Sequence, residues 1–220
     1  MERSSVAAVR QNVELLEKNK PQQERAKRTY EAILAAAAQL LVEVGVERIS
    51  TNLVAERAGI TVPALYRYFP NKYAVLNALG AVLMDKQNTV FKEWFDHYLA
   101  LGDLELLLDN VYELLQRTYD VTREQVGGLE IVQALRAVAP LREVRLASNR
   151  QVSEQLAVIV GEVLGQPVDD RIRAQARLTI EAGYATVEMA LEDDSLSPDL
   201  LMREASRMMR LYWRGFMEPE

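Results

Sequence analysis

Apolar residues recur at helical spacing in nearly every part of this chain, and strand-like alternation is almost absent. The stretch from Gln22 to Val44 is the clearest example, because one of its faces is apolar and Gly45 then provides a C-terminal stop. The pattern predicts an all-α protein of about nine helices, with an extra helix at the N-terminus. The apolar face of the first long helix consists of Ile33, Leu34, Ala37, Leu40, Leu41 and Val44.

Turn and capping residues divide the rest of the chain into further predicted helices. The extra N-terminal helix is predicted from the stripe Val6, Val9, Val13 and Leu16, which Pro21 separates from the next helix. Asp103 and Ser197 are placed to cap two of the later helices. The helices expected downstream span residues 71–102, 103–120, 128–140, 141–164, 170–191 and 198 onward.

Residues 49–72 read ISTNLVAERAGITVPALYRYFPNK and have the features of two short helices around a tight turn. Thr51 and Thr61 are placed to cap the two helices, and Gly59 can take the positive φ angle of the turn. Leu65 and Phe69 lie four residues apart, so the second helix turns both of them inward. Such a pair of helices, with the N-terminal end of the second exposed, predicts a helix-turn-helix that enters the major groove of DNA.

The run from Thr51 to Lys72, and above all its L-Y-x-Y-F-x-x-K ending, resembles the signature of the TetR family of transcriptional regulators. The resemblance implies a three-helix DNA-binding head at residues 22–72, after an extension at residues 1–21. A ligand-binding and dimerisation domain would occupy residues 73–220. The implied function is sequence-specific DNA binding, usually as a repressor that a small-molecule ligand releases from its operator.

The resemblance also implies contacts with the DNA backbone. Thr51 and Thr61 are expected to bond phosphates through their hydroxyl groups and the helix N-termini. Tyr66 and Tyr68 are expected to contact the backbone, and Lys72 to bind a phosphate. The alternative for the two tyrosines is that they are half-buried aromatic residues beneath the head.

Base reading is implied for the N-terminus of the second short helix, where Val62, Pro63 and Ala64 lie. Val62 departs from the polar or charged side chain that many family members carry at this position, and valine offers apolar contact alone. Hydrogen-bonded base reading is therefore assigned to Asn52 or Arg67, and Arg67 could reach either a base or a phosphate.

The charge distribution supports a DNA-binding head. Residues 1–72 carry 11 Lys and Arg against 8 Asp and Glu, whereas the rest carries 15 against 24, within an overall charge of −6. A basic head on an acidic body concentrates phosphate attraction at one end. Two interpretations stay open for the cluster Arg25, Lys27 and Arg28: a solvated helix face paired with Glu24 and Glu31, or a contact with phosphate or the minor groove.

The family resemblance further implies a ligand pocket among the middle helices and a homodimer through the last two. Pocket candidates are aromatic and polar residues, namely Met84, Trp94, Phe95, Tyr98, Tyr112, Tyr119, Gln133 and Arg136. Each of the last two helices has an apolar stripe. The stripes would either meet those of a second subunit in a four-helix bundle or pack on their own chain. The stripes are Ile172, Ala176, Ile180, Gly183, Val187 and Leu191, beside the small Ala182 and Ala185, and then Leu201, Ala205, Met208 and Tyr212.

Composition argues against an enzyme. The chain has no cysteine and a single histidine, His97, which excludes the common zinc sites and a cysteine nucleophile. Phosphate-loop, calcium-loop and nucleophile-elbow motifs are absent from the sequence, so we expect no metal, cofactor or catalytic residue. The N-terminus lacks the apolar run of a secretory signal, and no stretch reaches the roughly 20 apolar residues of a membrane span. A soluble cytoplasmic protein is expected.

Overall fold

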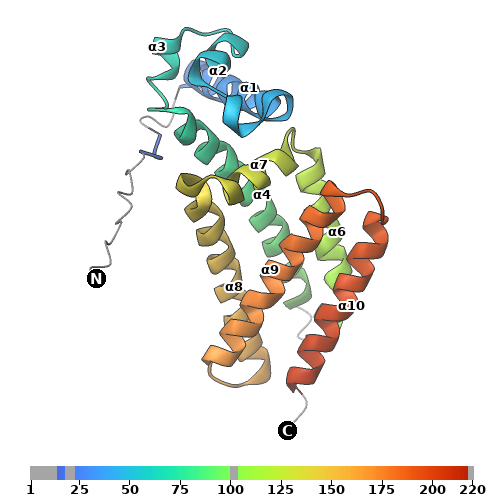
Figure 1. Cartoon of the computed structure of the whole chain (residues 1–220). Helices are drawn as coiled ribbons and strands as arrows, with labels where there is room; N and C mark the ends of the chain where they lie inside the picture. The colour runs from blue at the N-terminus through green and yellow to red at the C-terminus, as the bar shows by residue number, and fades with distance from the viewer. Residues whose placement is uncertain (1–13, 18–22, 100–103, 218–220) are drawn as a thin grey trace, which may run out of the picture.

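The computed structural model describes residues 14–17, 23–99 and 104–217, and within these ranges it is built from α-helices without a β-strand. The prediction of an all-α protein is confirmed. Three helices form a small head at the top of Figure 1, and the remaining helices form a larger body below it. The head helices are α1 (Glu24–Arg48), α2 (Thr51–Arg57) and α3 (Val62–Leu65).

The long helix α4 descends from the head into the body (Figure 1), where α6, α7 and α8 pack against it. A short 3-10 turn, Ala139–Leu141, joins α7 to α8. The body helices are α4 (Lys72–Leu99), α5 (Leu104–Asp109), α6 (Val111–Glu124), α7 (Gly128–Ala137), α8 (Arg142–Leu164), α9 (Asp170–Glu192) and α10 (Pro198–Met217).

Two hydrophobic cores fill the molecule, and α4 contributes to both of them. The first core joins α1, α2 and α3 to α7 and to the N-terminal half of α4, where Leu76, Leu79 and Leu83 are buried. The second joins the C-terminal half of α4, including Phe91 and Trp94, to α5, α6, α8, α9 and α10. The head core therefore includes part of the body, and the packing does not break at residue 72.

Two helix ends differ from the sequence-based prediction. Gly45 takes a positive φ of 74°, as a stop signal should, but helical turns resume and continue to Arg48. The single helix predicted for residues 103–120 is wrong, because the chain breaks at Asn110, whose φ of −106° and ψ of 12° are not helical. The Asn110 side chain donates to the Leu106 carbonyl (2.7 Å), and the Asn110 backbone carbonyl accepts from the indole of Trp94 on α4 (3.1 Å), so one local and one distant hydrogen bond replace the helical ones.

The predicted N-terminal helix falls largely outside the described residues, which include Leu16 but not Val6, Val9 or Val13. Residues 14–17 are not helical, and Leu16 is exposed. This short segment lies against the head, because Asn71 donates through its side-chain amide to the carbonyl of Glu14 (2.9 Å). The predicted N-cap Asp103 also lies outside the described residues, whereas Ser197 caps α10 through Leu200 N–H (3.2 Å).

The apolar stripe of α9 packs within its own chain. Ile172, Ala176 and Val187 are each at most 2% exposed. Gly183 lies against Leu115 of α6 and Met209 of α10, with atoms 3.4 and 3.6 Å from the position of an added Cβ. The alternative in which this stripe packs on its own subunit is therefore the one observed, and a second subunit would need another face of α9.

Helix α1 is the one described helix long and apolar enough to cross a membrane by length and composition. Its apolar residues are explained by the head core, since seven of them, from Ile33 to Leu41, are buried there. A core helix of a folded head passes the same test of composition, so we assign α1 to the core.

The corner between α6 and α7 packs against α1 of the head at Gly127. We therefore expect a larger side chain at Gly127 to destabilise the protein. An added Cβ there would lie 2.9 Å from the carbonyl oxygen of Ala38 in α1, and the φ of 69° disfavours any L side chain. Gly127→Ala is expected to lower the free energy of unfolding by about 2–4 kcal/mol through strain and overpacking.

Gly165→Ala is the matched control, because Gly165 has a φ of 64° with nothing within 4 Å of an added Cβ. It should cost about 1–2 kcal/mol, from backbone strain alone. Urea unfolding of the two variants measures the difference, and equal losses would show that the contact between Gly127 and α1 is not tight.

Candidate functional site

The helix-turn-helix forms from local signals that the sequence largely predicts. Thr61 caps α3, since its hydroxyl accepts a hydrogen bond from Ala64 N–H (3.3 Å), and Gly59 has a φ of 66° in the turn. The predicted cap of α2 is wrong by one residue. Ser50, whose hydroxyl accepts from Leu53 N–H (3.3 Å), is the N-cap, and Thr51 is the first helical residue. Both residues are good caps, and the extended backbone of Ser50, with φ −140° and ψ 159°, decides between them.

Burial fixes which face of α3 is available to a partner. Leu65 and Phe69 are fully buried and anchor the helix on the head core. The prediction that this helix also carries Phe69 is wrong, because α3 ends at Leu65, and Tyr66, Arg67 and Tyr68 lie in the turn that follows it. Thr61, Pro63, Tyr66 and Arg67 are exposed, Val62, Ala64 and Tyr68 are half-buried, and Asn52 is exposed on α2.

Thr51 does not cap α2, and its hydroxyl group forms a hydrogen bond with Tyr66 instead. Thr51 Oγ1 and the Tyr66 hydroxyl lie 3.1 Å apart, so the start of α2 is linked to the end of α3 across the turn. Tyr68 is held differently, because its ring packs edge-on against Tyr30 of α1 with centroids 6.4 Å apart. The half-buried alternative for the tyrosines thus describes Tyr68, whereas the Tyr66 ring stays 41% exposed.

Lys72 has a structural role at the base of the head. Its ammonium donates to the backbone carbonyls of Val46, Glu47 and Ile49 at 3.2–3.4 Å, at the C-terminal end of α1. A cation at this position satisfies helix carbonyls that have no partner within the helix and complements the helix dipole. Asn71 caps α4 at the same place by accepting from Ala74 N–H (3.0 Å). The predicted phosphate contact of Lys72 stays a prediction.

An ion pair that the sequence analysis missed fixes α2 on α1. Arg57 donates to both carboxylate oxygens of Glu43, at 2.6 and 2.7 Å, and this pairing lowers the pKa of Glu43. The two residues lie fourteen positions apart on different helices, so no helical spacing rule connects them. The pair sets how α2 is presented beside α3.

The basic cluster at the start of α1 lies beside the turn of the helix-turn-helix. Arg25 and Arg28 line an open surface depression together with Ala58 and Ile60, which flank the turn. Lys27 forms an ion pair with Glu24 (2.8 Å). Lys27 is thus paired within its helix, as the solvated-face interpretation expects, whereas a phosphate or minor-groove contact of the two arginines stays a prediction.

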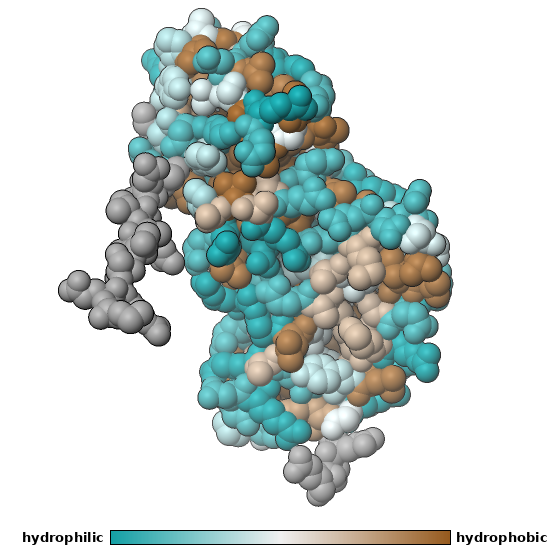
Figure 2. All heavy atoms as spheres, viewed as in Figure 1, coloured by the Kyte–Doolittle hydropathy of each residue, from teal (hydrophilic) through white to brown (hydrophobic). Residues whose placement is uncertain are grey.

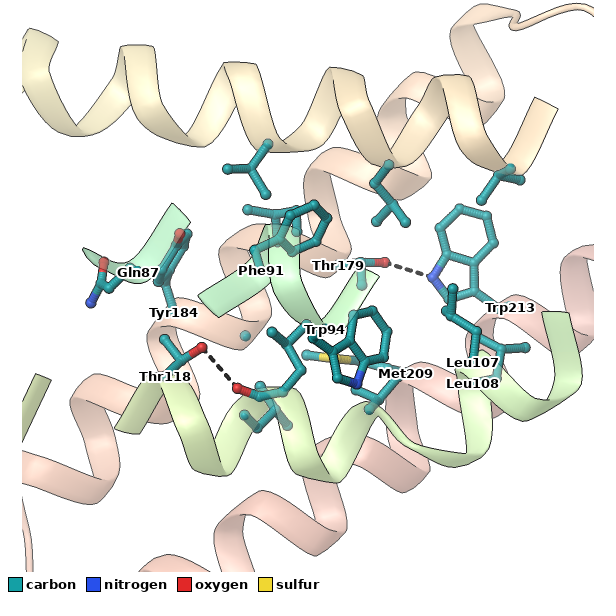
Figure 3. A pocket seen from close by; sticks show the side chains of 18 residues that line it. Gln87, Phe91, Trp94, Leu107, Leu108, Thr118, Thr179, Tyr184, Met209 and Trp213 are labelled. Atoms are coloured by element: carbon teal, nitrogen blue, oxygen red, sulfur yellow. Dashed lines mark hydrogen bonds between the residues drawn. The ribbon is translucent and has the colours of Figure 1, made fainter. Parts of the chain in front are cut away.

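An apolar cavity lies inside the second core, between α4, α5, α6, α8, α9 and α10 (Figure 3). The space open to the centre of a water molecule is about 70 Å³, enough for several waters. The lining residues are Gln87, Phe91, Trp94, Leu107, Leu108, Val111, Leu114, Leu115, Thr118, Val152, Leu156, Val160, Thr179, Ile180, Gly183, Tyr184, Met209 and Trp213.

One of the eight predicted pocket residues, Trp94, lines this cavity. Met84 and Arg136 line a smaller neighbouring cavity of about 10 Å³, which shares Gln87 and Tyr184 with the large one. The other five lie elsewhere in the fold. Phe95 stacks on Phe91, Tyr98 donates to Glu113 (2.7 Å), Tyr112 to Asp199 (2.7 Å), Gln133 to Glu192 (2.8 Å), and Tyr119 lies under Arg123.

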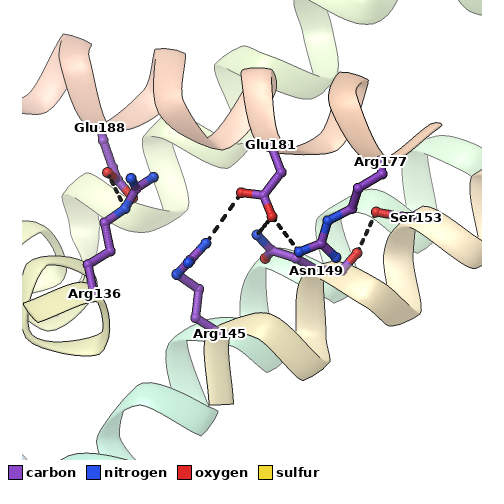
Figure 4. A network of polar contacts seen from close by, with 7 residues as sticks. All are labelled: Arg136, Arg145, Asn149, Ser153, Arg177, Glu181 and Glu188. Carbon is purple, nitrogen blue, oxygen red and sulfur yellow. Dashed lines mark hydrogen bonds and ion pairs between the residues drawn. The ribbon is translucent and has the colours of Figure 1, made fainter. Parts of the chain in front are cut away.

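A polar network between α8 and α9 borders the smaller cavity (Figure 4). Glu181 accepts hydrogen bonds from Arg145 (3.3 Å) and Asn149 (3.1 Å), and Arg177 forms an ion pair with it (2.6 Å). This network holds α8 against α9. No sequence pattern predicted it, because its members come from distant positions and meet only in the folded chain.

Nearby, Arg136 of α7 forms an ion pair with Glu188 of α9 (2.8 Å). Burial nevertheless raises the pKa of Glu188, and Arg136 partly offsets this effect. The predicted pocket residue Arg136 therefore has a carboxylate partner at the wall of the smaller cavity.

Known proteins match this chain over the head and over the whole fold. The family model for bacterial regulatory proteins of the tetR family matches residues 33–79. The class C tetracycline repressor protein of Escherichia coli is 42% identical over 59 residues, which is 27% of each chain, so this match spans about a quarter of that repressor.

Two further matches extend over the body. The HTH-type transcriptional repressor KstR of Rhodococcus jostii is 42% identical over 209 residues, or 89% of this chain and 96% of that protein. The crystal structure of a TetR-family transcriptional regulator from Streptomyces coelicolor shares the fold, with a TM-score of 0.60 and 24% identity over 85% of this chain and 98% of that one. With its helix-turn-helix head and all-helical body, this chain belongs to the TetR family of bacterial regulatory proteins.

Proposed function

We propose that this protein is a sequence-specific DNA-binding repressor that a small molecule in the apolar cavity releases from its operator. The observation that carries the proposal is the exposed N-terminal end of α3 on a rigidly packed head, the element that helix-turn-helix proteins insert into the major groove. Repression is the mode named for the relatives KstR and the tetracycline repressor. A cytoplasmic location follows from access to chromosomal DNA, and we propose no catalytic role.

The contact residues divide by exposure and by hydrogen-bonding capacity. Thr61 at the α3 N-terminus would bind phosphate through its hydroxyl, and so would Thr51 and Tyr66, whose hydroxyl groups lie 3.1 Å apart. Arg67 and Asn52, which are both exposed, are the proposed sources of hydrogen bonds to bases. Val62, Pro63 and Ala64 would add apolar contacts at the tip of α3, such as with a thymine methyl group.

Two other basic regions would extend the footprint. Arg25 and Arg28 would bind phosphate beside the turn, which favours the functional interpretation of these residues over a solvated face. Lys72 would act chiefly through the carbonyls of α1, by fixing the head on α4, and Tyr68 through its packing on Tyr30.

A homodimer would form through faces of α9 and α10 that do not pack on this chain. Apolar residues gather over these two helices on the face shown in Figure 2, and they include several that are about half exposed. These residues, rather than the buried stripe, would meet in a four-helix bundle that holds two heads about one turn of DNA apart. They are Leu178 and Met189 on α9, and Leu200, Met208, Leu211 and Tyr212 on α10.

Release would depend on α4. This helix forms one wall of the cavity through Gln87, Phe91 and Trp94, and it begins at Lys72 beneath the head. A ligand that binds more tightly to one tilt of α4 would shift the two heads of the dimer away from their operator spacing.

Operator binding should depend on Arg67. Arg67→Ala is expected to weaken binding to the DNA upstream of the gene by about 10-fold or more, since a base contact is worth about 1–3 kcal/mol. Electrophoretic mobility shifts measure the change. Arg150→Ala is the control, because it removes an exposed arginine from α8 in the body. The wild-type affinity should also fall steeply with added salt, as phosphate contacts require. A flat salt response would contradict the proposal.

The dimer should depend on the exposed face of α10. Leu211→Glu places a charge at a 56% exposed apolar position and is expected to convert the protein to a monomer, because two such charges would be buried in the symmetric contact. Sedimentation velocity measures the mass, and Val126→Glu, which is also 56% exposed but lies at the corner between α6 and α7, is the control. A dimeric Leu211→Glu variant would rule out this interface.

A further inference from the structure

The polar groups of the large cavity are nearly all satisfied by the protein itself. The Thr118 hydroxyl donates to the Leu114 carbonyl (2.8 Å). Thr179 donates to the Gln175 carbonyl (2.9 Å) and accepts from the indole of Trp213 (3.0 Å). A ligand gains little by replacing such bonds, so its polar groups would have to bind elsewhere along the wall.

Gln87 is one of two exceptions, and its orientation is fixed by a chain of hydrogen bonds. The Thr122 hydroxyl donates to the Thr118 carbonyl (2.7 Å), so it must accept from Gln87, at 2.8 Å from Nε2. The amide nitrogen therefore faces Thr122, and the amide oxygen faces away from it. Oε1 is buried and has no hydrogen-bond partner, within a side chain that is 2% exposed.

Tyr184 provides the second available group at the same end of the cavity. Figure 3 places Gln87 and Tyr184 at the end away from Trp213, and both residues line the large and the small cavity. No hydrogen bond of the Tyr184 hydroxyl is found among the described residues. Burial raises the pKa of Tyr184 to about 12, so this hydroxyl stays protonated and can donate as well as accept.

The electrostatics of the two cavities favour a neutral ligand. The residues that line the large cavity include no acidic or basic side chain. The smaller cavity has Arg145 and Glu188 in its wall, but Arg145 pairs with Glu181 and Glu188 pairs with Arg136. An anion in the large cavity would be buried with no basic side chain in its wall, which is unfavourable, and Arg145 in the smaller cavity already carries an ion pair with Glu181.

We propose that the effector is an uncharged molecule with a hydrocarbon body and one terminal hydroxyl group, which donates to Gln87 Oε1 and accepts from Tyr184. The hydrocarbon body lies between Phe91, Trp94 and the aliphatic residues of α8. This inference rests on the proposed function in taking the large cavity as the effector site. Gln87 supplies both the recognition and the connection to the head, because it lies on α4.

Matched probes test the chemistry directly. The space open to the centre of a water molecule is about 70 Å³, enough for several waters, so the probes are short linear molecules and not large ring systems. 1-Octanol and its isomer 1-methoxyheptane have the same formula, but only the alcohol can donate a hydrogen bond. Octanoate is the anionic probe. Anions are the main competing class of ligand, because the Nε of Arg145 has no hydrogen-bond partner.

The chain contains its own reporter of binding. Its two tryptophans, Trp94 and Trp213, both line the cavity, so their fluorescence follows occupancy without a label. 1-Octanol is expected to bind roughly tenfold more tightly than 1-methoxyheptane, the difference that an added net hydrogen bond produces. Octanoate is expected to bind more weakly than either.

Two buried glutamines provide a matched pair of variants. Gln87→Met should reduce the affinity for 1-octanol to that for 1-methoxyheptane and leave the ether unchanged. Gln175→Met makes the same change at a side chain that is 4% exposed, bonded to the Tyr212 carbonyl, and absent from the wall of either cavity. It should keep the tenfold preference, and so exclude a general effect of losing a buried amide.

Equal binding of the alcohol and the ether, preferential binding of octanoate, or no binding of any probe would overturn the inference. Mobility shifts with operator DNA separate this failure from failure of the proposed function. Release of the operator by octanoate would preserve the function and refute the neutral ligand. If 1-octanol binds selectively but does not release the operator DNA, Gln87 is supported as a binding site, and the cavity is refuted as the site of the effector.

Discussion

Helix α4 is buried in two hydrophobic cores at once, and this constraint determines how the rest of the molecule can work. Leu76, Leu79 and Leu83 fix its first half in the head core, whereas Phe91 and Trp94 fix its second half around the cavity. Close-packed cores do not deform continuously, so a change in cavity shape is transmitted along the helix instead of being absorbed locally. The head can thus respond to a ligand that it never contacts.

A second support limits how the head can move. Gly127, at the corner between α6 and α7, lies under the Ala38 carbonyl of α1, and α7 contributes Ile131 and Leu135 to the head core. A tilt of α4 must therefore occur against α7 or together with it. The unpaired oxygen of Gln87 belongs to α4, and Gln87 lines both cavities.

Much of the fold could be predicted from sequence, because its signals are local. Thr61, Gly59 and Ser197 act within three or four residues of their positions, and the helix-turn-helix depends on such signals. Predictions failed where distant residues decide. The break at Asn110 depends on the indole of Trp94, which is far away in the chain.

The same distinction explains the candidate site. The exposed residues of the helix-turn-helix follow from local signals, such as the cap at Thr61, whereas the cavity wall combines six helices and no periodicity describes it. Aromatic content drew attention to Tyr98 and Tyr112, which bond carboxylates instead. Gln87 was missed, because a buried amide with one unpaired oxygen is recognisable only in three dimensions.

Thermodynamic linkage tests the central claim, that cavity and head are coupled through α4. The affinity of the cavity ligand would be measured by tryptophan fluorescence with and without saturating operator DNA, and the operator affinity with and without saturating ligand. The account predicts that each partner weakens the other by the same factor, typically about 5- to 150-fold. A ligand that binds free and DNA-bound protein with equal affinity would contradict it.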